Sequence, residues 1–136
     1  MRRSVSLPIA AFVFVCAAVV AAQNGNGWQI PQTGRDEQSP LKPTADVLKK
    51  GKSTFGSRCQ KCHGPEGNGN GPESDPDEPA ADLTDGSRTA ANPDGVLFYK
   101  IWNGRKNPKM PAFKTDLGKD EIWAVVEYIK TLRQPA

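Results

Sequence analysis

The amino-acid sequence predicts an all-α fold in which a few helices are joined by long loops. Three segments carry apolar side chains at helical spacing, at about residues 45–58, 93–103 and 119–132. No segment shows a convincing alternation of apolar and polar residues, which is the pattern of a half-buried strand. The chain has 136 residues, enough for one small domain and too few for two. We therefore expect a single helical domain.

The N-terminus has the pattern of a secretory signal peptide. Arg2 and Arg3 precede an apolar run of 16 residues that ends in small residues at Ala22. This run is shorter than the roughly 18–20 residues that a membrane-spanning helix needs. We predict that residues 1–22 direct export to the periplasm and are then removed. The alternative is that the segment stays uncleaved as a membrane anchor.

The composition of the remaining chain narrows the classes of function. Removing residues 1–22 leaves 114 residues and takes away two arginines, which lowers the formal net charge from +3 to +1. A near-neutral chain gives no reason to expect nucleic-acid binding. The exported chain holds two cysteines, one histidine and one methionine, so few side chains are available for metal or redox chemistry.

Residues 23–43 predict a flexible tether, and the folded domain is expected to span residues 44–136. The tether begins with a stretch rich in glycine and asparagine. Three prolines are expected to interrupt any regular element: Pro31, Pro40 and Pro43. Trp28 and Ile30 are nevertheless apolar enough to pack against the domain.

The first two predicted helices have clear signals at their ends. Thr44 is the expected N-cap of the helix at Ala45–Arg58. Asn92 is the expected N-cap of the helix at Pro93–Asn103, and Gly104 is expected to end it. These signals agree with the apolar periodicity, so we expect both helices close to these bounds.

A long loop over residues 64–92, rich in Gly, Pro and Asp, joins these two helices. Loops of this length are uncommon in small domains, and wrapping a large ligand would explain this one. The glycine-rich stretch 67–71 follows no strand and lacks the Gly-Lys-Ser/Thr ending of a phosphate-binding loop. We therefore interpret it as a turn-forming segment.

Residues 59–63, Cys-Gln-Lys-Cys-His, form a C-x-x-C-H motif, which is typical of the covalent attachment site of a c-type haem. Cys59 and Cys62 can each bond to one vinyl group of the haem, and His63 can bind the iron. The alternatives are a thioredoxin-type dithiol, a structural disulfide and half of a zinc site. No βαβ pattern surrounds the motif, and the exported chain has no further Cys or His to complete four zinc ligands. We predict one covalently bound haem c.

Met110 is the candidate for the sixth iron ligand by elimination. The chain has no second histidine, and Met110 is its only methionine besides the initiator. It lies 47 residues after His63, and Pro108 and Pro111 stiffen the surrounding loop. The alternative is an ordinary methionine that fills a gap in the core. Histidine and methionine together would fill both axial positions, which favours electron transfer over substrate chemistry.

In combination, these residues resemble the class I cytochromes c over about residues 45–133. The resemblance rests on the following positions: Gly51, Phe55, Cys59–Gly64, Gly104, Met110-Pro111 and Tyr128. It implies that the first and last helices cross near right angles, with Gly51 and Phe55 against Tyr128. The chain is most similar to the bacterial subgroup found as soluble carriers and as haem subunits of oxidases and dehydrogenases. The acidic, proline-rich loop at Glu73–Ala81 departs from the family pattern.

The resemblance implies an electron-transfer protein rather than an enzyme, with haem attached outside the cytoplasm. We expect a monomeric exported carrier with His63 and Met110 as axial ligands. The alternative is a haem-bearing subunit or domain of a periplasmic dehydrogenase or terminal oxidase complex. A third interpretation, an enzyme or gas sensor with an open iron site, is disfavoured by Met110 because such a site needs a missing or displaceable sixth ligand.

Acidic and basic residues are concentrated in different segments of the sequence. Residues 64–87 contain seven acidic residues and no lysine or arginine, whereas basic residues flank both predicted iron ligands. An ordinary solvated surface would explain this pattern, and so would a basic ring that steers an acidic redox partner. For such a partner, the expected docking residues are Lys61, Arg105, Lys106 and Lys109.

Overall fold

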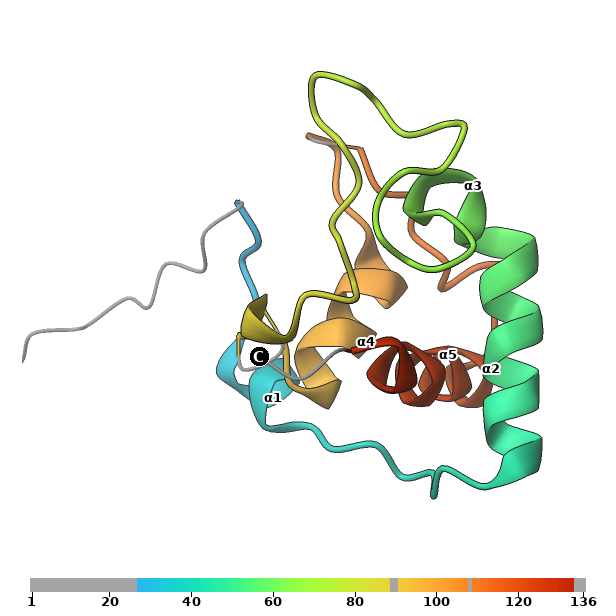
Figure 1. Ribbon diagram of the computed structural model, residues 1–136. Helices are drawn as coiled ribbons and strands as arrows, with labels where there is room; N and C mark the ends of the chain where they lie inside the picture. Colours follow the sequence, from blue (N-terminus) through green and yellow to red (C-terminus); the bar gives the residue numbers. More distant parts are fainter. Residues whose placement is uncertain (1–26, 89–90, 108, 134–136) are drawn as a thin grey trace, which may run out of the picture.

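The structure is a computed structural model that describes residues 27–88, 91–107 and 109–133 (Figure 1). Its elements are α1 (Gln32–Asp36), α2 (Ala45–Arg58), α3 (Gln60–His63), the 3-10 turn η1 (Gly86–Arg88), α4 (Asp94–Asn103) and α5 (Lys119–Leu132). Strands are absent from these described residues, so the predicted all-α fold is confirmed. None of the described helices is long and apolar enough to cross a membrane. The predicted signal peptide, residues 1–22, lies outside the described residues.

The bounds of α2 and α5 agree with the predicted helices, and local signals explain why. The Thr44 hydroxyl accepts a hydrogen bond from the Val47 N–H at 3.3 Å, so Thr44 is the N-cap of α2 as expected. At the start of α5, the Glu121 carboxylate accepts a hydrogen bond from the Gly118 N–H at 3.0 Å. Both bonds satisfy main-chain groups that a helix terminus would otherwise leave unpaired.

Helices α2 and α5 cross and form the most extensive contact between any two helices of the described chain (Figure 1). Gly51 permits this approach, because a Cβ atom there would collide with the main-chain oxygen of Ala124 and lie 2.8 Å from the Cβ of Tyr128. One turn later, the rings of Phe55 and Tyr128 are 5.4 Å apart at 60°, a favourable tilted arrangement. The expected contact of Gly51 and Phe55 with Tyr128 is confirmed.

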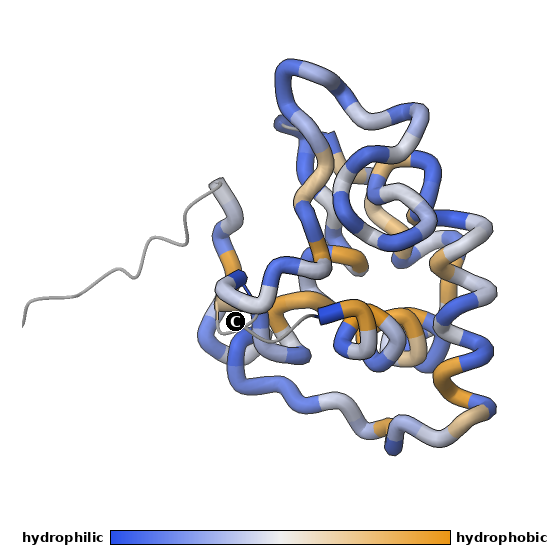
Figure 2. Tube along the Cα trace, in the orientation of Figure 1, coloured by the Kyte–Doolittle hydropathy of each residue, from blue (hydrophilic) through white to orange (hydrophobic). Residues whose placement is uncertain are grey.

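The core lies between α4 and α5 and is closed by α2 and by the segment after α4. Its buried apolar side chains are Phe55, Leu97, Phe98, Ile101, Phe113, Ile122, Trp123, Val125, Val126 and Ile129. The ring of Phe98 stacks on that of Trp123 with centroids 4.2 Å apart. Figure 2 shows the hydrophobic residues gathered along α4 and α5. The stacked pair therefore sets α4 against α5.

The start of α4 differs from the prediction. Pro93, and not Asn92, is the N-cap, and no side chain caps the helix there. The amide of Asn92 instead donates to the main-chain oxygen of Arg88 at 2.8 Å, and its oxygen accepts a hydrogen bond from Lys100 at 2.5 Å. The N-cap prediction is wrong because these contacts with η1 and with the middle of α4 engage the side chain.

A buried carboxylate connects α5 to the start of α4. The side chain of Glu127 is 2% exposed, and the Lys130 ammonium lies 3.0 Å from its carboxylate. The same ammonium lies 3.0 Å from the carboxylate of Asp94, in the first turn of α4. Lys130 thereby neutralises a buried charge and joins the two helices.

The segment before α2 packs on α4. Ile30 is buried, and α1 lies against α4 at one side of the molecule (Figure 1). The expectation that the prolines exclude regular structure is wrong, because Pro31 stands at the N-cap of α1, where a missing N–H costs nothing. The division of the chain into residues 1–22, 23–43 and 44–136 stays a prediction.

We expect Gly51→Ala to destabilise the protein by about 3 kcal/mol, because the added Cβ meets main-chain atoms of α5 that cannot move aside. Gly56→Ala on the same helix is the matched control, since a Cβ there meets only the Gln60 side chain at 3.8 Å. It should be neutral or stabilising by up to about 1 kcal/mol. Denaturant unfolding of both variants measures the difference, and equal stabilities would contradict the crossing.

Candidate functional site

The C-x-x-C-H motif lies where α2 ends and α3 begins. Cys59 is the C-cap of α2, and its N–H donates to the main-chain oxygen of Phe55 at 2.8 Å. Residues three and four positions apart share one face of a helical turn, so Cys59, Cys62 and His63 lie on the same side. Both thiols are free and half-buried. This arrangement suits bonds from two sulfur atoms to one flat cofactor with an imidazole against its metal.

The two thiols are suited to thioether bonds. Burial, and to a smaller extent the neighbouring Cys62, raise the pKa of the Cys59 thiol to about 12, so this thiol is neutral at physiological pH. The Cys62 thiol lies 3.7 Å from the main-chain oxygen of Glu73, to which it donates. A zinc site needs thiolates, whereas a thioether leaves sulfur uncharged, so this environment fits covalent haem attachment better than zinc.

His63 is held by a main-chain carbonyl. Its Nδ1 lies 3.0 Å from the oxygen of Ala81, and because a carbonyl can only accept, Nδ1–H is the donor. This tautomer leaves the lone pair on Nε2. Burial lowers the pKa of His63, which favours the neutral imidazole that binds metals. The role of Ala81 could not be predicted from the sequence, because a main-chain acceptor has no side-chain signature.

The glycine-rich stretch 67–71 and the residues after it cap α3. Three N–H groups donate to the last carbonyls of the helix: Gly69 to His63 at 2.8 Å, Gly71 to Cys62 at 3.0 Å and Glu73 to Lys61 at 2.7 Å. Gly69 has a φ of +86°, which favours glycine. A Cβ at Gly71 would collide with the main-chain oxygen of Lys61. The predicted turn-forming segment is confirmed, and it fixes the backbone of the motif.

Met110 lies on the segment that follows α4. Its side chain is half-buried and packs against the core. Its backbone pairs with Arg105 through two hydrogen bonds, from the Arg105 N–H to the Met110 oxygen at 2.8 Å and in reverse at 2.9 Å. Gly104 enters this turn with a φ of +58°, and a Cβ there would collide with Met110. The thioether therefore has a defined main-chain position.

Apolar side chains continue the core toward the cysteines and Met110. Those that remain partly exposed in this direction include Cys59, Leu83, Trp102, Met110 and Leu117. In Figure 1, α3 with its loop and the segment after α4 both lie at the same end of the molecule. Two thiols, a neutral imidazole, a thioether and neighbouring apolar side chains are a set of groups that fits a c-type haem.

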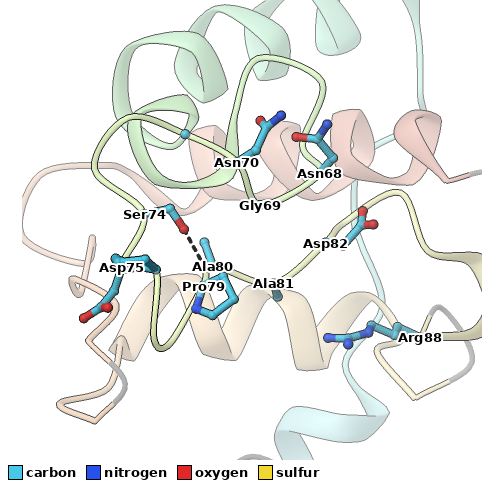
Figure 3. Close-up of a pocket in the computed structure, with 12 residues that line it drawn as sticks. Asn68, Gly69, Asn70, Ser74, Asp75, Pro79, Ala80, Ala81, Asp82 and Arg88 are labelled. Atoms are coloured by element: carbon cyan, nitrogen blue, oxygen red, sulfur yellow. Dashed lines mark hydrogen bonds between the residues drawn. The ribbon is translucent and has the colours of Figure 1, made fainter.

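Two surface hollows lie near these residues. One, of about 340 Å³, is lined by Asn103, Arg105, Lys106, Lys109, Met110, Pro111 and Ala112. The other, of about 560 Å³, is lined by residues of the long loop (Figure 3). Figure 3 shows Ser74 accepting a hydrogen bond from the Ala80 N–H, at 2.9 Å. The lining of this larger hollow includes neither cysteine of the motif, nor His63, nor Met110.

Comparisons with known proteins agree with this description. The sequence pattern of the family described as cytochrome C oxidase, cbb3-type, subunit III matches residues 46–129. The fold is similar to that of the reducing HAO-like protein complex of Kuenenia stuttgartiensis, with a TM-score of 0.58 and 31% sequence identity. That similarity covers 70% of this chain and 47% of the other chain, so the chain spans about half of that relative's length. No curated protein sequence matches the chain.

We expect the double variant Cys59→Ser with Cys62→Ser to lose its haem on acid–acetone extraction and denaturing electrophoresis, because no thioether can form. Wild type should keep its haem through both treatments. The single variant Cys62→Ser is the control and should retain part of the haem through Cys59. Wild-type protein that releases its haem would contradict covalent attachment.

Proposed function

We propose that this chain, which belongs to the cytochrome c oxidase, cbb3-type, subunit III family, is an exported carrier of single electrons with one haem c. Membership of this family implies electron transfer by haem. The observation that carries the proposal is the 3.0 Å hydrogen bond between His63 Nδ1 and the Ala81 oxygen. It orients the imidazole of the C-x-x-C-H motif so that Nε2 can bind iron, as outer partners of metal-bound histidines do.

Four side chains would hold the haem. Cys59 and Cys62 would form the two thioether bonds, and His63 and Met110 would bind the iron. When bound, haem supplies an iron that changes between the ferrous and ferric states. The chain's own contribution is rigidity, because Ala81 fixes the imidazole and main-chain pairing fixes Met110. Ligation of the iron by His63 and Met110 would favour electron transfer over substrate chemistry.

Export to the periplasm is part of the proposal. It is supported by the apolar run that ends at Ala22 and by the two arginines before it. One haem is proposed because the chain contains one C-x-x-C-H motif.

A basic surface beside Met110 is the proposed docking site for an acidic redox partner. Lys106 and Lys109 are exposed and line the hollow at Met110. The Lys61 ammonium lies 3.0 Å from the exposed carboxylate of Glu73, a pair that solvent weakens. Arg105 is half-buried, so we assign the main contribution to Lys106 and Lys109.

A second candidate function is that of a haem subunit in a larger complex. Two observations favour it: the matched family is described as a subunit of an oxidase, and the similar structure is a protein complex. The electron-transfer chemistry would be the same, but the partner would be fixed.

Purification of the tagged protein from its native host separates the two functions. A free carrier should elute at the size of a monomer, because its partners bind only transiently. Stoichiometric co-purification with a large subunit would instead establish the second function. The charge-reversal variant Lys106→Glu with Lys109→Glu is the control, since it should weaken a transient electrostatic encounter more than a permanent interface.

We expect Met110→Ala to remove the sulfur-to-iron absorption band at the red end of the ferric spectrum and to lower the reduction potential. The reason is that the thioether stabilises ferrous iron. The variant should also bind carbon monoxide, which wild type should bind poorly. Lys109→Ala is the control, because it changes the adjacent residue and leaves the thioether. If Met110→Ala keeps the band and the potential, the axial assignment is wrong.

A further inference from the structure

The segment before α2, residues 27–43, lies outside the part of the chain that matches the family, yet it is packed tightly on α4. Ile30 is 7% exposed. A Cβ at Gly95 of α4 would collide with the main-chain oxygen of Gly34, and a Cβ at Gly34 would lie 3.2 Å from the ring of Tyr99. We call residues 27–43 the strap. Close approach of two glycines indicates a specific contact between the strap and α4.

The strap places an indole beside two cations. The centroid of the Trp28 ring lies 5.4 Å from the Lys100 ammonium and 4.9 Å from the centre of the Arg105 guanidinium. Both distances are within the range of cation–π attraction. Burial, followed by the charges of Arg105 and Arg35, lowers the pKa of Lys100 to about 8, so these cations are close enough to repel one another. Attraction of each cation to the Trp28 ring offsets part of that repulsion.

Arg105 connects the indole to Met110. Its side chain contacts Trp28, while its main chain makes both hydrogen bonds of the pair with Met110, at 2.8 and 2.9 Å. Gly104 directly precedes Arg105, has a positive φ and lies against the main chain of Met110. Restricting the Arg105 side chain therefore restricts the turn that carries the thioether.

We propose that Trp28 is a positioning residue for the iron ligand Met110 and acts through Arg105. This inference rests on the proposed function, which makes Met110 a ligand. If the loop that carries Met110 were disordered, it would lose conformational entropy when the thioether binds iron. The strap removes part of that loss by holding Arg105, so Met110 stays on the ferric iron more completely. Because thioether ligation raises the potential, the strap also raises the potential.

The test compares Trp28→Leu with Trp28→Phe in the haem-loaded protein. Leucine keeps apolar bulk but removes the aromatic face, whereas phenylalanine keeps an aromatic face. The temperature dependence of the sulfur-to-iron band gives the equilibrium constant for Met110 binding to ferric iron. We expect Trp28→Leu to lower this constant about fivefold and to lower the potential, and Trp28→Phe to restore most of both.

Two further variants separate positioning from plain stability. Ile129→Val removes one buried methyl group of the core, so it should lower the unfolding temperature and leave the band and the potential unchanged. Arg105→Leu removes the proposed intermediary. In that background, Trp28→Leu should cause no additional loss of the band, because the two residues act in series.

The outcomes distinguish this inference from the function on which it rests. If wild type lacks the sulfur-to-iron band, Met110 is not the ligand and both proposals fail. If wild type has the band and Trp28→Leu lowers only the unfolding temperature, the strap merely stabilises the fold and the positioning role is wrong. If Trp28→Leu weakens the sulfur-to-iron band equally in wild type and in Arg105→Leu, Trp28 does not act through Arg105.

Discussion

The contact of Gly51 with the main chain of Ala124 decides where the other parts of the molecule lie. With no side chain between them, α2 rests directly on α5, and the end of α2 is fixed over the core. Cys59 caps that end of α2, and α3 follows directly. The crossing of α2 and α5 therefore determines where the C-x-x-C-H motif lies. On the other side, Trp123 of α5 stacks on Phe98 of α4, which fixes the start of the segment with Met110. Helix α5 thus positions both parts of the candidate haem site, the C-x-x-C-H motif through α2 and the Met110 segment through α4.

Main-chain groups position the candidate ligands more than side chains do. The carbonyl of Ala81 orients His63, N–H groups of the glycine-rich loop hold the carbonyls of α3, and the backbone of Arg105 pairs with that of Met110. Such contacts demand close approach of two backbones, and glycines are found where a Cβ would prevent it. This explains why the chain around the site is rich in glycine.

Local signals predicted the parts of this structure that depend on local interactions. The bounds of α2 and α5 follow from apolar periodicity and from capping residues such as Thr44, and the turn-forming stretch follows from its glycines. The cap of α4 was mispredicted because Asn92 makes contacts with residues outside the first turn. The packing of Ile30 was anticipated from its apolar side chain, whereas helix α1 was not, because it has only five residues and is held by tertiary contacts. Cys59, Cys62, His63 and Met110 were found from their residue types, whereas Ala81 acts through an atom that every residue has.

The acidic loop that departs from the family pattern is closed at its base. Ser74 and Ala80 are joined by a hydrogen bond of 2.9 Å, and the intervening residues project away from the helices (Figures 1 and 3). Ala81, the partner of His63, lies just beyond this closure, and Leu83 is tied back to Gly67 at 2.7 Å. Insertions and deletions at the tip can therefore accumulate without moving the histidine. The same property makes residues 75–77 a permissive position for grafting a peptide epitope or a recognition sequence onto the protein.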